Sequence, residues 1–407
     1  METGTGKEHG HSVELARRTR LVLAEVAWSF RRNNDLRAAS SLAFSLAIAL
    51  IPSLFLVTTI AGITVGSSQA AFSRMQEVLQ QLLPGYSREI LREVRNIAAY
   101  RGAISAVNAL VLLLTVTPLV SSLRDVLGTI FRRKPGRPFL LEKLYDVALT
   151  IVFLVGITAI GVIGVVVTVL KKQLPLPVPY GAFGTIVLFL FLVITVFLLY
   201  AAFSAGMPKR YLAAGALTAT ALWFLMRPLF HLFIAFNPGY GFAFGSFKSL
   251  FVVIIWLYYS LIVFLLGAEL AAAIGRRELA AVRRLMAGRR DVPMSVAGGY
   301  VVRYQQGDRI FSAGDAGGNM FYVLRGGVTI CQGERELTTV REGHYFGMVS
   351  FLLGTPRTAS AAVIEDAELV MINQQNISGL MQESPELIIA MLKEVAGRMR
   401  EANRVRE

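Results

Sequence analysis

One short segment combines glycines, an apolar run and an arginine at a spacing that suits phosphate binding. It runs from Tyr345 to Ser360 and reads YFGMVSFLLGTPRTAS. Gly347 followed by a one-turn helix would expose backbone N–H groups, and such groups at a helix N-terminus favour an anion. Arg357, which follows Pro356, can add a charge-assisted hydrogen bond. The segment therefore predicts a site for a phosphate-containing ligand.

Three ionisable residues lie in long apolar runs, where a charge is expensive unless it faces a cavity or a partner. Arg227 stands beside Pro228, with His231 about one helical turn further on. Arg227 either lines a pathway or contacts an anion, or it bonds backbone carbonyls that the proline frees; the sequence leaves both open. Glu269 is a candidate pathway carboxylate, although pairing with Arg276 or another arginine at that end of the run is favoured.

The composition indicates a membrane protein. Of the 407 residues, 54% are hydrophobic and only 17% are charged, which is less charge than a soluble protein of this length carries. The 20 residues from Ser249 to Ala268 include no Asp, Glu, Lys or Arg, and at ~1.5 Å per residue they cross a hydrocarbon layer of ~30 Å. Such runs recur. We expect an α-helical integral membrane bundle with six spans, near residues 40–66, 103–123, 146–170, 181–205, 211–236 and 249–274.

The basic residues predict the orientation of these spans. Residues 1–290 carry a net charge of +17 and residues 291–407 carry −3. With the N-terminus inside, the inner segments hold 21 Lys and Arg residues and the outer segments hold 8. The positive-inside rule then predicts that both termini are cytoplasmic. Cys331 is the only cysteine, so no intramolecular disulfide can form, and this fits a reducing compartment for the C-terminal part.

Four parts follow along the chain. Residues 1–37 are predicted to form a cytoplasmic amphipathic segment, and residues 38–275 the six-span membrane domain. Residues 276–299 are predicted to be a basic helix and linker, whose arginines suit anionic lipid headgroups. In residues 300–407, short strand-like segments alternate with glycines and a helical tail follows. This pattern predicts a cytoplasmic β-roll with a C-terminal helical lid.

The membrane part resembles a known family through three groups of residues. These groups are Asp35 to Phe44 (DLRAASSLAF), Gly215 to Trp223, and Tyr240-Gly241 with Trp256-Leu257-Tyr258 and Leu266 to Leu270 (LGAEL). Together they resemble the YihY/BrkB membrane protein family, over about residues 15–280. The resemblance implies a multi-pass protein of the bacterial inner (plasma) membrane. It implies no settled activity, and both transport and envelope maintenance stay open.

No residue set predicts an enzyme, although the YihY/BrkB family was once mislabelled ribonuclease BN. A metal-dependent nuclease needs clustered His and Asp ligands. The four histidines of the sequence, His9, His11, His231 and His344, form no metal-ligand cluster. No nucleophile–base set is evident either. We therefore expect no catalytic residues, no metal and no cofactor.

The C-terminal part resembles the cyclic nucleotide-binding domain. The resemblance rests on Phe346-Gly347 followed by Gly354-Thr355-Pro356-Arg357, and on Gly307-Asp308, Gly314-Asp315 and Gly326-Gly327 before them. It implies that Arg357 meets the cyclic phosphate and that Thr358 contacts phosphate or base. Gly347, Met348 and Val349 would complete the ligand site, and helices after Asn376 would form the lid.

Met348 departs from the pattern of that domain. A glutamate commonly follows the Phe-Gly pair there and bonds the ribose hydroxyl, whereas a methionine thioether is at best a weak acceptor. Leaving a buried polar group of the ligand unpaired costs ~1–3 kcal/mol, which lowers affinity roughly ten- to hundred-fold. Three outcomes stay open: weak binding of cyclic AMP or cyclic GMP, a different ligand that uses Arg357, or an empty module kept for interactions.

Two functions remain open from the sequence. In the first, the protein is a transporter or channel regulated by a cyclic nucleotide or a related phosphate compound. In the alternative, it is a non-transporting envelope or scaffold protein whose degenerate C-terminal domain recruits partners or forms a homo-oligomer. A nucleic-acid partner is not expected, because the module is acidic and no DNA-reading helix-turn-helix follows the lid. The apolar face for dimerisation would consist of Leu387, Met391, Val395 and Met399.

Overall fold

The computed structural model describes residues 5–65, 106–132, 144, 147, 180–204, 206–237, 248–289, 292–383, 389, 391–397 and 400. The chain divides into two units. One comprises Val26–Ala272, and the other comprises Met1–Glu25 together with Ala273–Glu407. Helix α1 (Thr5–Arg32) contributes to both units. The first residues of the chain thus belong to the same unit as its C-terminal part.

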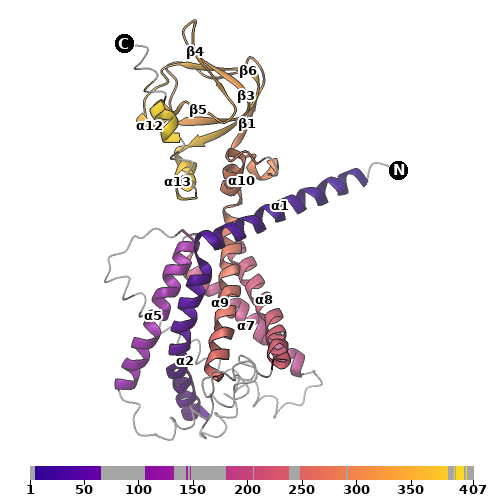
Figure 1. Ribbon diagram of the computed structural model, residues 1–407, viewed down its shortest axis with the longest axis vertical. Coiled ribbons are helices and arrows are strands. Elements are labelled where there is room, and N and C mark those ends of the chain that lie inside the picture. Colours follow the sequence, from indigo (N-terminus) through magenta and orange to yellow (C-terminus); the bar gives the residue numbers. More distant parts are fainter. Residues whose placement is uncertain are drawn as a thin grey trace. The chain divides into compact units, whose positions relative to one another are not determined.

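The unit Val26–Ala272 is helical, because its sequence consists of long apolar runs with few charges. Its helices pack around one buried cluster, to which each of five helices contributes: Leu42, Leu127, Phe203, Leu212 and Leu265 all lie there. Figure 1 shows these helices side by side. They are α2 (Asp35–Val65), α5 (Ala106–Ile130), α7 (Tyr180–Phe203), α8 (Lys209–Phe236) and α9 (Lys248–Gly275).

Three helices among the described residues are long and apolar enough to cross a membrane. They are Thr185–Phe203, Lys209–Phe236 and Leu250–Gly275, and they coincide with the predicted spans 181–205, 211–236 and 249–274. Helices α2 and α5 overlap the predicted spans 40–66 and 103–123. The predicted span 146–170 lies outside the described residues, apart from position 147. The total of six spans and their orientation therefore stay predictions.

Glycines set the contact between α8 and α9. A Cβ atom on Gly215 would lie 2.4 Å from the carbonyl oxygen of Gly267, and one on Gly267 would lie 2.5 Å from the Cβ of Ala219. The hydroxyl of Tyr200 donates to the carbonyl of Phe264 at 2.5 Å and fixes α7 beside α9. A side chain at either position would clash with the facing helix, so only glycine allows this approach of the two backbones, as is common between helices in a lipid environment.

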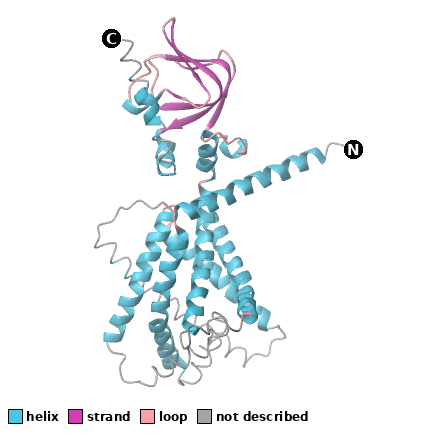
Figure 2. Ribbon diagram, viewed as in Figure 1, coloured by secondary structure: helices cyan, strands magenta, loops and turns pink. Residues whose placement is uncertain are grey.

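The C-terminal part contains a six-stranded antiparallel sheet (Figure 2). The two long strands, β3 (Asn319–Gln332) and β6 (Ser360–Asn373), pair with each other. Strand β6 also pairs with β1 and β2, and β3 also pairs with β4 and β5. Stacked rings fill the core, with the centroids of Phe321 and Phe346 5.2 Å apart and Phe311 beside both. The strands are β1 (Val301–Tyr304), β2 (Arg309–Phe311), β3 (Asn319–Gln332), β4 (Arg335–Arg341), β5 (Tyr345–Phe346) and β6 (Ser360–Asn373).

Short helices pack against this sheet through a second apolar cluster. Helix α10 has an amphipathic sequence, and its apolar face is buried there through Ala281, Val282 and Met286, together with Leu21 of α1. The hydroxyl of Tyr322 on β3 donates to the carbonyl of Met286 at 3.0 Å. The apolar side of this basic helix is thus covered by protein. The helices are α10 (Arg277–Met286), α11 (Met294–Ala297), α12 (Met348–Leu353) and α13 (Gln374–Glu383).

Candidate functional site

The predicted phosphate segment folds as a glycine turn followed by a short helix. Gly347 has a φ of 74° and immediately precedes α12, and Gly354 closes that helix with a φ of 66°. Both values lie in the left-handed region that glycine adopts without steric strain. The hydroxyl of Ser350 donates to the carbonyl of Pro356 at 3.2 Å and ties the following loop to the helix. This bond brings Arg357 back toward the start of α12.

Arg357 is held by backbone carbonyl groups of its own domain. Only 5% of the residue is exposed. Its Nη1 donates to the carbonyl of Gly347 at 2.9 Å, and its Nη2 donates to the carbonyl of Asn319 at 2.5 Å. The guanidinium carbon lies 4.1 Å from the ring centroid of Phe311, a geometry that favours a cation–π contact.

The charge of Arg357 is only partly compensated. Burial lowers the pKa of the guanidinium, while the nearby Asp315 carboxylate raises it. The Nε atom is buried and has no hydrogen-bond partner among the described residues. A buried donor without a partner is unfavourable. An anion that reached Nε would satisfy this donor and would add a second negative group beside the buried cation.

The other expected ligand residues differ in exposure. Met348 is buried in the apolar cluster that also contains Tyr345, Phe351 and Met391. Val349, the next residue of α12, is 47% exposed, and Thr358 is exposed as well. The structure thus places Gly347 and Arg357 in direct contact, and Met348 in the core beneath them.

The C-terminal helical segment packs beside the candidate site. The carboxylate oxygens of Glu394 accept a hydrogen bond from the backbone N–H of Tyr345, each at 3.2 Å. Met391 is buried in the same cluster as Met348, and Val395 packs against that cluster. This segment therefore contacts the strand that leads directly into Gly347.

The three polar candidates of the helical unit lie in different surroundings. Arg227 is half-buried and His231 is exposed on the surface of α8. Glu269, in contrast, is fully buried. Its Oε1 accepts a hydrogen bond from Nδ2 of Asn33 at 2.5 Å. The structure brings Glu269 together with the α1–α2 connection.

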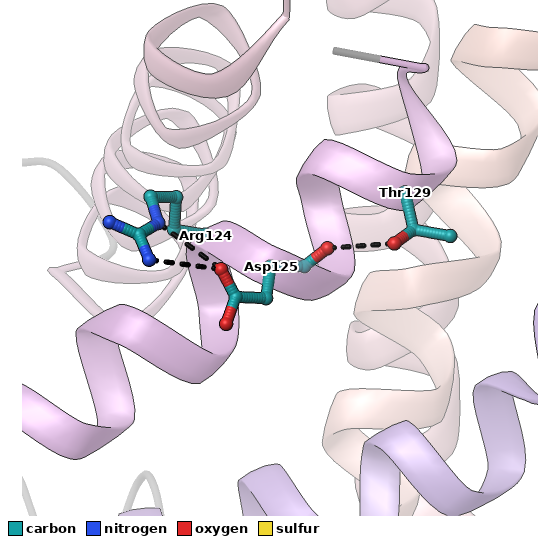
Figure 3. Close-up of polar contacts among 3 residues, drawn as sticks. All are labelled: Arg124, Asp125 and Thr129. Carbon is teal, nitrogen blue, oxygen red and sulfur yellow. Dashed lines mark hydrogen bonds and ion pairs between the residues drawn. The ribbon is translucent and has the colours of Figure 1, made fainter. Parts of the chain in front are cut away.

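A further ion pair of the helical unit lies on its surface. Nε and Nη2 of Arg124 donate to Oδ1 of Asp125 at 3.2 and 3.1 Å, as Figure 3 shows. The hydroxyl of Thr129 donates to the backbone carbonyl of Asp125 at 2.9 Å. Because the Asp125 side chain is 69% exposed, water screens this pair and it contributes little to stability.

Sequence reasoning missed three contributors to the candidate site. The carbonyl of Asn319, the ring of Phe311 and the carboxylate of Asp315 surround Arg357. A backbone carbonyl leaves no side-chain signature. Phe311 reaches Arg357 only through the pairing of β2 with β6, which no local pattern reveals. Gly314-Asp315 was part of the resemblance to the cyclic nucleotide-binding domain, but nothing in the sequence indicated that Asp315 lies near Arg357.

Comparisons with known proteins match the helical part and the C-terminal β-sheet domain to two different families. Residues 301–384 match the cyclic nucleotide-binding domain. The fold and the site thus define a membrane protein that carries a cyclic nucleotide-binding domain. Residues 27–291 match the family described as virulence factor BrkB. Since this match covers more than half of the sequence, the chain belongs to that family.

The curated relatives are membrane proteins of low sequence identity. A UPF0761 membrane protein of Aeromonas salmonicida is 25% identical over 289 residues, which are 68% of this chain and 97% of that protein. One of Alkalilimnicola ehrlichii is 24% identical over 65% of this chain, and the chain spans only 60% of its length. Among solved structures, the Thermus thermophilus catabolite activator protein is 31% identical, with a TM-score of 0.24, over 27% of this chain and 55% of that one.

Proposed function

We propose that the chain is a non-enzymatic protein of the bacterial inner membrane, with six spans and both termini in the cytoplasm, whose membrane part is a transporter or channel. A cyclic nucleotide or a related phosphate compound bound at Arg357 regulates it. Support comes from the membership in the BrkB family, from the three long apolar helices and from the attached cyclic nucleotide-binding domain.

One observation carries the ligand proposal. The Arg357 guanidinium is buried beside the left-handed turn at Gly347, and its Nε donor has no partner among the described residues. The amides of the first turn of α12 have no carbonyl within their own helix to bond, as at every helix start. Backbone amides and a buried guanidinium together suit the oxygens of a phosphate.

Met348 narrows the class of ligand. Its side chain belongs to an apolar cluster and offers at best a weak acceptor to a ribose hydroxyl. A mononucleotide therefore loses one polar contact, and we expect its affinity to be roughly ten- to hundred-fold below that of domains with a glutamate at this position. A ligand that relies mainly on its phosphate, such as a cyclic dinucleotide, is affected less.

Contacts of α10 support a route from the ligand domain toward the membrane part. Besides the Tyr322–Met286 hydrogen bond, α10 packs on α13: a Cβ atom on Gly379 would lie 2.9 Å from Leu279. Helix α10 follows α9 after Arg276 alone. A ligand shifts the membrane part only if it binds two conformations unequally. Movement of α13 or β3 would reach α10 directly through these contacts.

The test is a calorimetric titration of the purified full-length chain with cyclic AMP, cyclic GMP and cyclic dinucleotides. We expect saturable heat with at least one of them, and its loss in Arg357→Ala. Arg357→Lys keeps the charge but not the paired hydrogen bonds, so it should bind more weakly than the wild type. Arg303→Ala is the matched control, because Arg303 is exposed and pairs with Glu368 on the same sheet. Absence of heat from a folded wild-type chain would refute the ligand proposal.

The scaffold alternative receives less support from the structure. Of the apolar face expected to dimerise, Met391 is buried within this chain and Val395 packs on the same cluster; Leu387 and Met399 lie outside the described residues. A partner could reach Met391 only if the segment left its own core. Native mass measurement of the full chain would favour the scaffold function if it showed a stable oligomer without any response to phosphate ligands.

A further inference from the structure

Helix α1 carries leucines on two opposite sides. Leu21 is buried in the apolar cluster that includes α10 and part of the sheet. Leu15 and Leu23 are instead 60% and 59% exposed. With 3.6 residues per turn, Leu23 lies about 200° around the helix from Leu21 but only about 80° from Leu15. One side of α1 is therefore covered by protein, while the two exposed leucines share another side.

The exposed side of α1 is also basic. Its exposed positions between the two leucines include no acidic residue and three arginines, which are Arg17, Arg18 and Arg20. Arg20 stands on one flank of the leucines, with Arg17 beyond it, and Arg18 stands on the other flank. The hydroxyl of Thr19, which lies between the leucines, donates to the backbone carbonyl of Leu15 at 3.0 Å. This hydroxyl is therefore not left unpaired on the apolar strip.

A buried ion pair keeps this part of α1 close to the end of a candidate span. Glu25 pairs with Arg283 of α10, and their side chains are only 3% and 13% exposed. Arg283 follows Gly275, the last residue of the candidate span Leu250–Gly275, by eight positions. Because α10 rises only ~1.5 Å per residue, the chain itself keeps Arg283 within roughly 20 Å of Gly275. A span ends at the bilayer surface, so this part of α1 is held near that surface.

We propose that the side of α1 formed by Leu15, Leu23, Arg17 and Arg20 binds the headgroup layer of a bilayer that contains anionic lipids. The leucines enter the boundary between headgroups and acyl chains, as the apolar faces of interfacial helices do. The guanidinium groups contact the lipid phosphates, and the negative surface potential of the leaflet attracts them. This surface is separate from the site at Arg357 and requires no ligand there.

An anionic bilayer surface is the partner that matches both the leucines and the arginines. A nucleic acid would pair with the arginines but would leave the leucines in water. An apolar protein surface would cover the leucines but would desolvate the arginines, which is costly without counter-charges. The headgroup boundary accepts the apolar strip and supplies negative charge beside it, so both parts of this side are satisfied.

Quenching by brominated lipids tests the contact. The full-length chain with Cys331→Ser and Leu23→Cys is labelled with bimane and placed in nanodiscs of brominated phosphatidylcholine, with or without phosphatidylglycerol. We expect strong quenching in the anionic discs, and its partial loss without phosphatidylglycerol or at high salt, which screens charge. Leu337→Cys is the matched control, because Leu337 is an exposed leucine on β4; its label should stay unquenched in both discs.

Substitutions of the arginines test the role of charge. Arg17→Gln together with Arg20→Gln should lower the quenching at position 23 in anionic discs to its level in phosphatidylcholine discs. Arg303→Gln, on the exposed surface of β1, should leave it unchanged. Arg18 is kept, because its guanidinium pairs with Glu14.

Two outcomes would overturn the proposal. The first is a label at position 23 that brominated lipid fails to quench in anionic discs; access of aqueous iodide to that label, or its loss on addition of RNA, would then show whether water or a nucleic acid meets this side of α1. The second is quenching that is equal in both kinds of disc and unaffected by the arginine substitutions, because anionic lipid would then have no part in the contact.

Discussion

The guanidinium of Arg357 has two uses that compete with each other. It donates to the carbonyl oxygens of Gly347 and Asn319, and under the proposed function it also binds a phosphate. A phosphate oxygen carries a negative charge that a carbonyl oxygen lacks and attracts the guanidinium more strongly, so a phosphate can take over one of these donors. The carbonyl that is released lies at the start of α12 or of β3, and a ligand would thereby change the bonding of the domain itself.

Gly347 tests this arrangement through a matched pair of substitutions. A Cβ atom on Gly347 would lie 2.7 Å from Nη1 of Arg357, whereas one on Gly343 would meet nothing within 4 Å; both have positive φ, 74° and 86°. Alanine at either position costs ~1–2 kcal/mol for the left-handed backbone. We expect Gly347→Ala to destabilise the chain more than Gly343→Ala in denaturant unfolding, and to weaken ligand binding as well. Equal effects would show that Arg357 is not confined by Gly347.

At the residue level, the local backbone of the phosphate segment could be predicted, while the ligand-binding role of its residues stays a prediction. The glycine, the short helix and the arginine of the phosphate segment are neighbours in sequence, so their turn could be recognised. The contact between Glu269 and Asn33 could not be predicted, because the two residues are 236 positions apart. The expected pairing of Glu269 with an arginine stays a prediction. Only the packing of helices reveals a neighbour so distant along the chain.

Among the elements, α1 gains stability from a contact with α10. Arg283 forms an ion pair with Glu25, whose side chain is 3% exposed, and Leu21 is buried in the cluster shared by α10 and the sheet. Removal of one partner from a buried ion pair is strongly destabilising, because the remaining charge stays desolvated. The pair of Glu14 with Arg18 on the same helix is exposed, so water solvates the charge that remains when one partner is removed.

These two ion pairs make a comparison within one helix. We expect Glu25→Ala to lower the free energy of unfolding by ~3 kcal/mol or more, and Glu14→Ala by less than ~1 kcal/mol. Denaturant unfolding of the full-length chain measures both. A double-mutant cycle with Arg283→Ala then isolates the pair. A small loss in Glu25→Ala, close to that of Glu14→Ala, would mean that α1 does not depend on α10.

At the level of elements, the three long apolar helices could be predicted, because the charged residues at the two ends of an uncharged run mark where the helix begins and ends. The three candidate spans begin and end within a few residues of the predicted ones. The amphipathic character of α1 could also be predicted, but not what covers its apolar side: Leu21 is buried among protein side chains, together with Val282 and Met286 of α10. The expected contact of the arginines in residues 276–299 with lipid headgroups stays a prediction.

At the scale of the molecule, the proposed orientation can be tested with the native thiol. Cys331 is the only cysteine of the sequence, it is not in a disulfide and it is half-buried on β3. A membrane-impermeant maleimide should label it in inside-out vesicles and leave it unlabelled in intact spheroplasts. Asn237→Cys in a Cys331→Ser background should show the opposite pattern, because residue 237 begins a predicted outer segment. Labelling of Cys331 in intact spheroplasts would refute the cytoplasmic placement.

The joining of Met1–Glu25 with Ala273–Glu407 in one unit also sets an order of events during synthesis. Glu25 and Arg283 are 258 positions apart, and at ~5–20 residues per second a ribosome needs roughly 10–50 s to make the second after the first. Throughout this time Leu21 and Glu25 are without their final contacts, while the intervening helices are being made. A chain that stops before α10 therefore lacks the residues that cover Leu21 and pair with Glu25 in the finished unit.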